Sequence, residues 1–350
     1  MYEQIKPLLF KLDPEVAHLV VESALKYSPY IPFFKEYLAK KNFIVDDALS
    51  LEVDGIRFQN PIGLGAGFDK NGVVIEMMPA LGFGFTEVGT ITPKPQSGNE
   101  KPRLFRFPNE ESLQNGMGFN NKGVYYLSKN LKKIYPYCIP IGVNIGKNKA
   151  TPNEESLLDY EKLIKEIKNK CDYMTINIST PNTPNLRDLQ NESFIKELFI
   201  MARGESDKPI YLKIAPDMEI DTALGISYSA IEHGASGIIA TNTSVDYSLL
   251  NGAKDFGGIS GRAIQAKSRE FFQALAKELF TKTTLISVGG IDSAKEAYLR
   301  IRSGASLVQV YSALVFHGPD LIKNINLGIL DLLKSDGFTN IKDAIGADLR

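Results

Sequence analysis

A polar, proline-stiffened loop follows a strand-like apolar run at residues 176–190, INISTPNTPNLRDLQ. Asn177, Ser179, Thr180, Asn182 and Thr183 crowd amide and hydroxyl groups into this loop, more than a plain connection needs. Amides bind the carbonyl and N–H groups of a ligand, and a hydroxyl can take a proton only if it has a hydrogen-bonded exit for its own. The loop therefore predicts a binding site, and the residues alone leave open which of its two neighbouring hydroxyls, Ser179 or Thr180, is the important one.

Two lysines lie in apolar or glycine-rich segments that we expect to be buried, where a charged side chain is energetically unfavourable. Lys213 stands between apolar neighbours in YLKIAPD, and Lys70 follows the glycine-rich segment GLGAGFD. An unpaired buried ammonium group is unfavourable, so each lysine must meet an anion. For Lys213 the structural alternative is a pair with Asp217, and the functional one is a cofactor ring that gains negative charge on reduction. For Lys70 one answer is a substrate carboxylate.

Asparagines and glycines complete the candidate site. Asn115, Asn144, Asn177 and Asn242 offer donors and acceptors, which suits a planar ring bearing C=O and N–H groups. The segments VGGIDS, VYSA and GGISGRAI let backbone N–H groups face a phosphate. Together these residues predict a phosphorylated, reducible cofactor beside a small, planar, amide-rich acid.

A regular scaffold must bring these residues together. Strands buried on both faces read as continuous apolar runs, and eight strand–helix units over about 260 residues fit a barrel of typically ~250 residues. We predict an α/β fold, a (β/α)8 TIM barrel with an N-terminal amphipathic helical extension, with its chemistry at the C-terminal strand ends. The rival is a doubly wound sheet, but no G-x-G-x-x-G opens a helix after the first strand. The eight runs are NPIGLGAG, FGFTEVGTIT, IPIGVNIG, CDYMTINIS, PIYLKIAP, GASGIIATNT, TTLISVGG and ASLVQVYSAL.

Turns and insertions refine this fold. Asp54-Gly55 lies between two short alternating strands in LSLEVDGIRFQN, which predicts a tight hairpin that plugs the barrel floor. The stretch DTALGISYSAIEHGAS has helical spacing and a stop at Gly234. Two long insertions, 91–139 and 243–283, are predicted to be functional lids.

Composition excludes several classes of function. The net charge of −1 gives no electrostatic case for nucleic acid binding. Two cysteines and three histidines are scattered without metal-ligand spacing or a disulfide framework, so we expect no metal and a reducing cytoplasm. No apolar run approaches the roughly 20 residues that cross a bilayer, and the start does not read as a signal peptide. We expect an intracellular protein that does not span a membrane.

The N-terminal segment reads as a separate unit. From Pro14 to Tyr27, residues at helical spacing form one mostly apolar stripe, and a second short amphipathic piece follows around Phe33 and Phe34. One alternative is a helical hairpin packed onto the barrel, and the other is a helix pair lying in the membrane interface. We divide the chain into residues 1–45 as an amphipathic membrane-access segment, 46–335 as the cofactor-binding barrel, and 336–350 as a C-terminal tail without a functional interpretation.

These motifs closely resemble dihydroorotate dehydrogenase, specifically its membrane-associated, quinone-reducing class (class 2). The resemblance runs from about residue 5 to residue 325 and is most specific in GLGAGFDKNG, EVGTITPKPQSGNEKPRLFR, NGMGFNNKG, GVNIGKNK, NISTPNTPNLR, IATNT, GGISGR, VGGIDS and ASLVQVYSAL. It implies an FMN-bearing (β/α)8 barrel that oxidises (S)-dihydroorotate to orotate in pyrimidine (UMP) biosynthesis, with a quinone as terminal acceptor. It also favours the interfacial position of the N-terminal helices, on the cytoplasmic face of the cell membrane.

The resemblance assigns roles position by position. Lys70 would pair with the substrate carboxylate and also border the flavin, and Asn177 would touch both ligands. Residues implied to line FMN are Ala66, Gly67, Phe68, Asp69, Lys70, Thr90, Asn144, Asn177, Lys213, Thr241, Gly261, Gly290, Tyr311 and Ser312. Residues implied to hold dihydroorotate are Lys70, Asn115, Gly116, Met117, Gly118, Phe119, Asn177, Asn182, Asn242 and Thr243.

The chain departs from the family pattern at two positions. The family's catalytic base in this class is a serine, and the matching residue here is Thr180, with Ser179 as the alternative. Threonine keeps the hydroxyl but adds a methyl group and a stiff χ1. The second departure is Gly116, where the family often has arginine.

Three other functions compete with this one. A soluble relative would pass electrons to fumarate or a nicotinamide, but the amphipathic extension and the base other than cysteine speak against it. A phosphate-binding barrel isomerase or lyase without redox chemistry would be colourless when purified. An inactive membrane-bound scaffold leaves two buried-looking lysines and a full set of polar strand ends unexplained.

Overall fold

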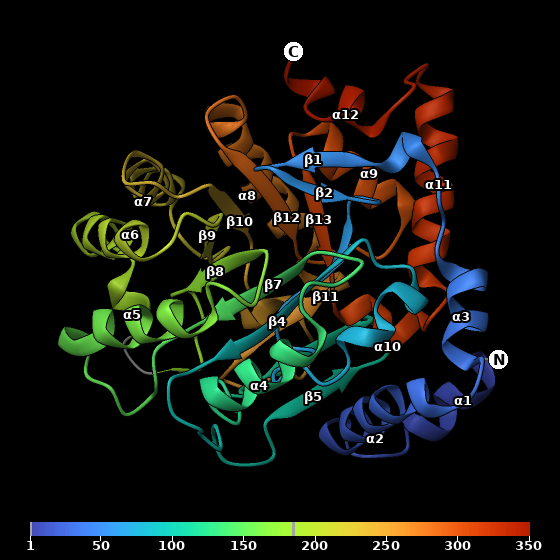
Figure 1. Cartoon of the computed structure of the whole chain (residues 1–350), viewed down its shortest axis with the longest axis horizontal. Helices are drawn as coiled ribbons and strands as arrows, with labels where there is room; N and C mark the ends of the chain where they lie inside the picture. The colour runs from blue at the N-terminus through green and yellow to red at the C-terminus, as the bar shows by residue number, and fades with distance from the viewer. Residues whose placement is uncertain (1, 184–185) are drawn as a thin grey trace.

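All eight apolar runs form parallel strands, which close into one barrel in the computed structural model, describing residues 2–183 and 186–350 (Figure 1). Consecutive barrel strands along the chain are neighbours, and the last pairs with the first, Val308 beside Ile62. The predicted TIM barrel is confirmed. The strands are β3 (Ile62–Leu64), β4 (Phe85–Ile91), β7 (Ile141–Ile145), β8 (Tyr173–Asn177), β9 (Ile210–Ile214), β10 (Gly237–Ala240), β12 (Thr284–Val288) and β13 (Leu307–Val310).

Helices surround the barrel because each strand is buried on both faces and needs an apolar cover. The helix predicted before Gly234 is α7, and Gly234 ends it at φ 106°, a conformation that glycine adopts without strain. The covering helices are α4 (Val124–Ile134), α5 (Ser156–Ile167), α6 (Glu192–Glu205), α7 (Ile220–Glu232), α8 (Gln265–Leu279), α9 (Ala294–Arg302), α10 (Ser312–His317) and α11 (Leu321–Ser335).

The predicted hairpin closes the barrel floor. Strands β1 (Leu51–Val53) and β2 (Ile56–Phe58) pair antiparallel around Asp54-Gly55, and both turn residues have positive φ. The Asp54 carboxylate accepts hydrogen bonds from Tyr211 Oη at 2.6 Å and Thr284 Oγ1 at 3.2 Å. Tyr211 is the second residue of β9 and Thr284 is the first of β12, so Asp54 ties the hairpin to the N-terminal end of the barrel.

The two long insertions meet across the opposite end. The first contains β5 (Leu104–Phe107) and β6 (Ser112–Asn115), and the second contains β11 (Gly258–Gly261). These strands form one three-stranded antiparallel sheet in the order β11-β6-β5. The insertions are therefore largely regular structure, and each also supplies one of the covering helices, α4 and α8.

The N-terminal segment forms helices α1 (Tyr2–Leu9), α2 (Pro14–Tyr27) and α3 (Phe34–Asn42). In Figure 1, α3 lies beside α10 and α11, and α2 lies nearer β5. Asp13 caps α2 by accepting from the backbone N–H groups of Glu15 and Val16. The predicted apolar stripe of α2 faces outward, with Leu19 48% and Val20 47% exposed. Eleven of the seventeen exposed large hydrophobic side chains in the described part of the chain lie in residues 1–40.

The C-terminal tail folds back onto the barrel. Helix α12 (Ile341–Ala344) buries both of its terminal residues, and Asn340 caps it while donating to Asp47 O at 2.8 Å. Arg302 pairs with Asp336 and Asp348 on either side of the helix. Over the described ranges, every helix is too short or too polar to cross a membrane, and Cys138 and Cys171 are both free thiols.

Candidate active site

A cavity opens at the C-terminal ends of the barrel strands, below the sheet β11-β6-β5. It encloses about 1370 Å³, counting the part open to solvent. Most of the residues that the sequence assigned to one site lie on its wall. They are Ala66, Gly67, Lys70, Thr90, Asn115, Met117, Gly118, Phe119, Asn177, Thr180, Asn182, Lys213, Thr241, Asn242, Thr243, Gly261, Gly290, Tyr311 and Ser312.

Four assigned residues lie behind or beside this wall. Asp69 is buried and accepts hydrogen bonds from the backbone N–H groups of Val73 and Val74, so it shapes the turn that carries Lys70. Phe68, Asn144 and Gly116 are likewise absent from the cavity lining. A direct ligand contact therefore stays a prediction for these four, and their observed contacts are with the protein.

The structure separates the two candidate hydroxyls. Thr180 lines the cavity, and its Oγ1 accepts from the backbone N–H of Asn182 at 3.2 Å, which leaves its own proton free to be donated. Ser179 is fully buried and does not line the cavity. Its Oγ accepts from Asn242 Nδ2 at 2.9 Å and donates to Asn177 Oδ1 at 3.3 Å. Thr180 is thus the hydroxyl that a ligand can reach, although Pro184 and Asn185 of the same motif lie outside the described residues.

The assigned asparagines form two hydrogen-bonded groups. Asn144 Oδ1 accepts from Asn177 Nδ2 at 3.1 Å, and Asn177 Oδ1 accepts from Asn242 Nδ2 at 3.3 Å. On the facing side, Asn182 Nδ2 donates to Asn115 Oδ1 at 3.2 Å, which joins the Thr180 loop to strand β6. The carboxyl ends of neighbouring parallel strands bring these amides to one edge.

Neither lysine has a carboxylate partner within ion-pair distance in the described ranges, and both face the cavity. Burial lowers the pKa of Lys213, and Glu87 opposes this by favouring its charged form. Burial also lowers the pKa of Lys70, whose Nζ donates to Gly67 O at 2.8 Å. The structural alternative for Lys213 is wrong, because Asp217 pairs instead with Lys267 at 3.0 Å. Both ammonium groups can therefore receive a ligand anion.

Several features of the wall fit a phosphorylated planar cofactor. Thr241 Oγ1 and Gln309 Oε1 are buried and lack a hydrogen-bond partner among the described residues, so ligand polar groups can satisfy them. Gly261 has φ 97° and Gly290 has φ 71°, and a Cβ at Gly290 would come within 2.6 Å of Gln265. At these two positions the backbone conformation and the protein atoms packed against it require glycine, and both glycines line the cavity.

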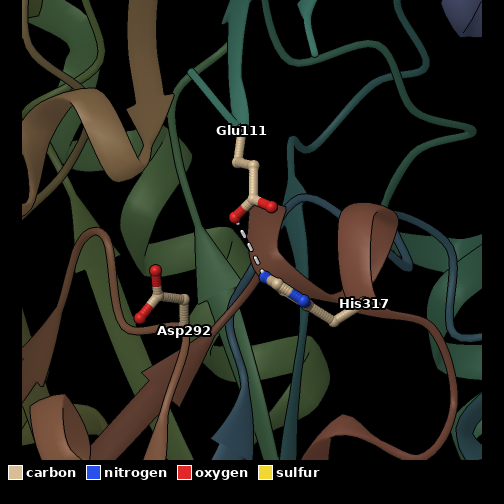
Figure 2. Close-up of side chains that lie close together, drawn as sticks. All are labelled: Glu111, Asp292 and His317. Atoms are coloured by element: carbon tan, nitrogen blue, oxygen red, sulfur yellow. Dashed lines mark hydrogen bonds and ion pairs between the residues drawn. The ribbon is translucent and has the colours of Figure 1, made fainter. Parts of the chain in front are cut away.

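Sequence reasoning missed a charged group at the rim, which Figure 2 shows as Glu111, Asp292 and His317. Their ligand atoms lie within 4.8 Å of one another, a spacing that a metal ion could use. However, Arg262 already pairs with Glu111 at 2.6 Å and with Asp292 at 3.0 Å, and His317 contacts Glu111 at 3.1 Å. Pairing across 206 residues gives no local signature in the sequence.

His18 is a second residue that sequence reasoning left among scattered histidines. Helix α2 carries it to the cavity wall, where its ring packs edge-on against Phe68 with centroids 5.1 Å apart. Burial lowers the pKa of His18 to about 3, and the positive charge of Lys70 acts in the same direction. The N-terminal segment therefore contributes a neutral imidazole to the site.

Comparison with known proteins identifies similar chains across the whole length. A family model described as dihydroorotate dehydrogenase matches residues 48–333. A protein of a Nitratiruptor species named dihydroorotate dehydrogenase (quinone) is 57% identical over 349 residues, which are 100% of this chain and 99% of that protein. A protein of the same name from a Sulfurovum species is 56% identical over 347 residues, covering 99% of this chain and 98% of its own.

Solved structures agree with the sequence comparison. The crystal structure of DHODH from Eimeria tenella in complex with ferulenol superimposes with a TM-score of 0.88 at 34% identity, covering 97% of this chain and 96% of the other. The ligand-free form from the same organism gives a TM-score of 0.88 at 35% identity, covering 97% and 100%. The similarity therefore includes the N-terminal helices as well as the barrel.

Proposed function

The chain belongs to the dihydroorotate dehydrogenase family, and from this premise we propose that it oxidises dihydroorotate to orotate on bound FMN and reduces a membrane quinone. The observation that carries the proposal is the joint position of Lys70, Lys213 and Thr180 on one cavity wall. The ammonium groups of Lys70 and Lys213 have no carboxylate partner among the described residues and can bind ligand anions. The Thr180 hydroxyl lies on the same wall as these lysines and the asparagine amides. Relatives at 57% and 56% identity carry the corresponding name.

The residues of the chain divide the work on the substrate. Lys70 binds the carboxylate, and Asn115, Asn177 and Asn242 hold the carbonyl and N–H groups of the planar ring. Thr180 takes the proton from C5 while the hydride leaves from C6, so that a C=C bond forms and the product is orotate. Because an alcohol is a poor base, Thr180 must pass its own proton onward as it accepts this one.

The family is flavin-dependent, and we infer that the flavin is FMN. When bound, it supplies the two-electron acceptor for the hydride. Lys213 lies on the barrel wall where its charge favours a ring that becomes more negative. Gly261, Gly290 and Ser312 provide the small, close-approaching wall that a phosphate needs.

Quinone reduction is proposed for the side of the cavity that the N-terminal helices cover. Aromatic rings are in contact from His18 to Phe68 and from Phe68 to Tyr311, with ring centroids 5.1 and 6.1 Å apart. Arg106 joins the same region, where it donates to Phe10 O at 3.2 Å. The outward apolar stripe of α2 favours insertion into one leaflet of the cytoplasmic membrane face, so residues 1–45 act as the access segment and 46–335 as the catalytic barrel.

Two measurements test this function. Denaturation of the purified protein should release FMN in about a 1:1 ratio to protein, as the single-site cavity requires. Dihydroorotate-dependent turnover should then be measured with a quinone, fumarate or a nicotinamide as acceptor. Turnover with the quinone alone supports the proposal, whereas a preference for fumarate or a nicotinamide contradicts the acceptor, and a colourless protein contradicts the redox chemistry.

A further inference from the structure

A buried carboxylate lies behind the cavity wall, outside every residue set assigned above. Glu87 belongs to β4, is fully buried and does not line the cavity. Its Oε1 accepts from Asn144 Nδ2 at 2.8 Å. Its Oε2 accepts from Tyr173 Oη at 3.3 Å, Thr175 Oγ1 at 3.1 Å and Gln309 Nε2 at 2.7 Å. All four partners donate, and an ionised carboxylate can only accept.

Three asparagines continue from this carboxylate toward the substrate side. Asn144 donates to Glu87 and accepts from Asn177, which in turn accepts from Asn242. Asn242 Oδ1 closes the series by accepting from the backbone N–H of Thr243 at 2.8 Å. Each amide therefore points its NH2 group toward Glu87 and its oxygen away from it.

We propose that Glu87 is a positioning residue that fixes the direction of this amide chain, and so determines which polar atoms Asn177 and Asn242 present to the substrate. An amide can be turned by 180° at little steric cost, because its nitrogen and oxygen have nearly the same size. Because the Glu87 carboxylate can only accept, Asn144 must turn its NH2 group toward it, and the orientation of Asn144 then favours one orientation of Asn177 and Asn242. The inference rests on the proposed function, since it concerns recognition of the orotate ring.

Turning the amides of this series by 180° would be unfavourable at the end that lies away from Glu87. If Asn177 were turned, its Nδ2 would face the backbone N–H of Ser179, which now donates to Asn177 Oδ1 at 3.2 Å. A turned Asn242 would likewise set Nδ2 against the N–H of Thr243. The two ends thus agree, and a glutamine at position 87 would bring them into conflict when its NH2 group, and not its oxygen, meets Asn144.

Glu87 has a second effect through its charge. Among the described residues, it is the acidic group whose field raises the pKa of Lys213 against the effect of burial. Neutralising Glu87 would remove a negative charge near the flavin position. Both ligands of the cavity would therefore respond to a residue that touches neither.

The test compares three variants as flavin-loaded proteins. Glu87→Gln keeps the shape but places an NH2 group among four donors. Tyr173→Phe is the matched control, since it removes one donor from the same buried group and leaves the direction intact. The double variant Glu87→Gln with Asn144→Asp exchanges the two groups, so that the glutamine at position 87 donates to the carboxylate at position 144 and Asn177 keeps its acceptor.

The readouts are the orotate dissociation constant, from the change in flavin absorbance, and the midpoint potential of the bound flavin. Glu87→Gln should weaken orotate binding roughly tenfold or more and raise the potential, because a donor facing a donor is left unsatisfied. Tyr173→Phe should change the dissociation constant less than about threefold, and the double variant should recover most of the lost affinity. Such a result would show that orotate binding depends on the direction of the hydrogen bonds along the three asparagines, and not only on their presence.

Other results would overturn the inference. Wild-type affinity in Glu87→Gln means that the carboxylate does not set the amides. A double variant that keeps its flavin but binds orotate as weakly as Glu87→Gln means that the carboxylate is needed at position 87 itself. If the wild-type protein fails to bind orotate at all, the proposed function fails first, so the two failures are distinguishable.

Discussion

A buried ion pair helps to attach the N-terminal helices to the rest of the protein, and its removal gives a quantitative prediction. Arg103 donates to both carboxylate oxygens of Glu15, at 2.8 and 3.3 Å, and the side chains are only 7% and 10% exposed. Burial disfavours ionisation of Glu15, but Arg103 and Lys101 outweigh it and hold its pKa below the ordinary value. Arg103 also donates to Ser97 O and Asn99 O at 2.7 Å, so it is fixed from the barrel side.

Glu15→Ala leaves this guanidinium buried without its counter-charge. Breaking a buried pair by removing one partner typically costs about 3–5 kcal/mol, and the low exposure of both side chains leaves little solvent screening. We expect amide exchange in residues 2–42 to accelerate by about two orders of magnitude or more, since 1.4 kcal/mol is about tenfold. Quinone turnover should fall while flavin reduction by dihydroorotate is retained.

Lys101→Ala provides the matched control. Lys101 contacts the same Glu15 oxygen at 3.3 Å but is 63% exposed, so its removal should cost no more than about 1 kcal/mol. Hydrogen exchange followed by mass spectrometry, with quinone kinetics alongside, measures both variants. Unchanged exchange in residues 2–42 of Glu15→Ala would refute the idea that this pair holds the helices in place.

Three further predictions concern the base, the acid response and the membrane face. Thr180→Ala should slow flavin reduction at neutral pH by roughly three orders of magnitude while FMN stays bound, because general bases typically contribute about 10²–10⁴ to the rate. Stopped-flow absorbance measures this rate, and a larger loss in Ser179→Ala would show that Ser179, and not Thr180, is the base. The pKa of His18 is about 3, lowered by burial and Lys70, so the unfolded state binds the proton first and stability falls as pH falls from about 6.5 toward 3. His18→Phe should remove about 2 kcal/mol of the difference in unfolding free energy between pH 7 and pH 5, measured with urea, and an unchanged difference would contradict the assignment. Leu19→Glu with Val20→Glu, both on exposed positions, should weaken vesicle binding roughly tenfold or more in sedimentation, while unaltered binding would exclude this face.

The barrel could be predicted because its strands are buried on both faces. Runs such as IPIGVNIG and PIYLKIAP are nearly continuous in apolar residues, and polar residues at their ends mark the mouth. Most assigned site residues follow from this rule alone, since the ends of parallel strands share one edge. The Asp54-Gly55 hairpin was predictable for an equally local reason, because Asp-Gly is a pair that readily adopts the two positive φ angles of a tight turn, and both residues have them here.

Features that depend on distant pairing could not be predicted. The sheet β11-β6-β5 joins Asn115 to Gly258, and each insertion alone reads only as a polar loop. His18 reaches the cavity because of how α2 docks, which the spacing of its apolar stripe does not determine. Glu87 did carry a usable indication, because an acid inside a buried strand must be paired.

The most direct measurement is anaerobic mixing of the purified protein with dihydroorotate, followed by addition of quinone, with flavin absorbance recorded throughout. We expect rapid bleaching on the first addition and full return of colour on the second. A flavin that keeps its colour with saturating dihydroorotate would contradict the conclusion that this cavity places the substrate against the cofactor.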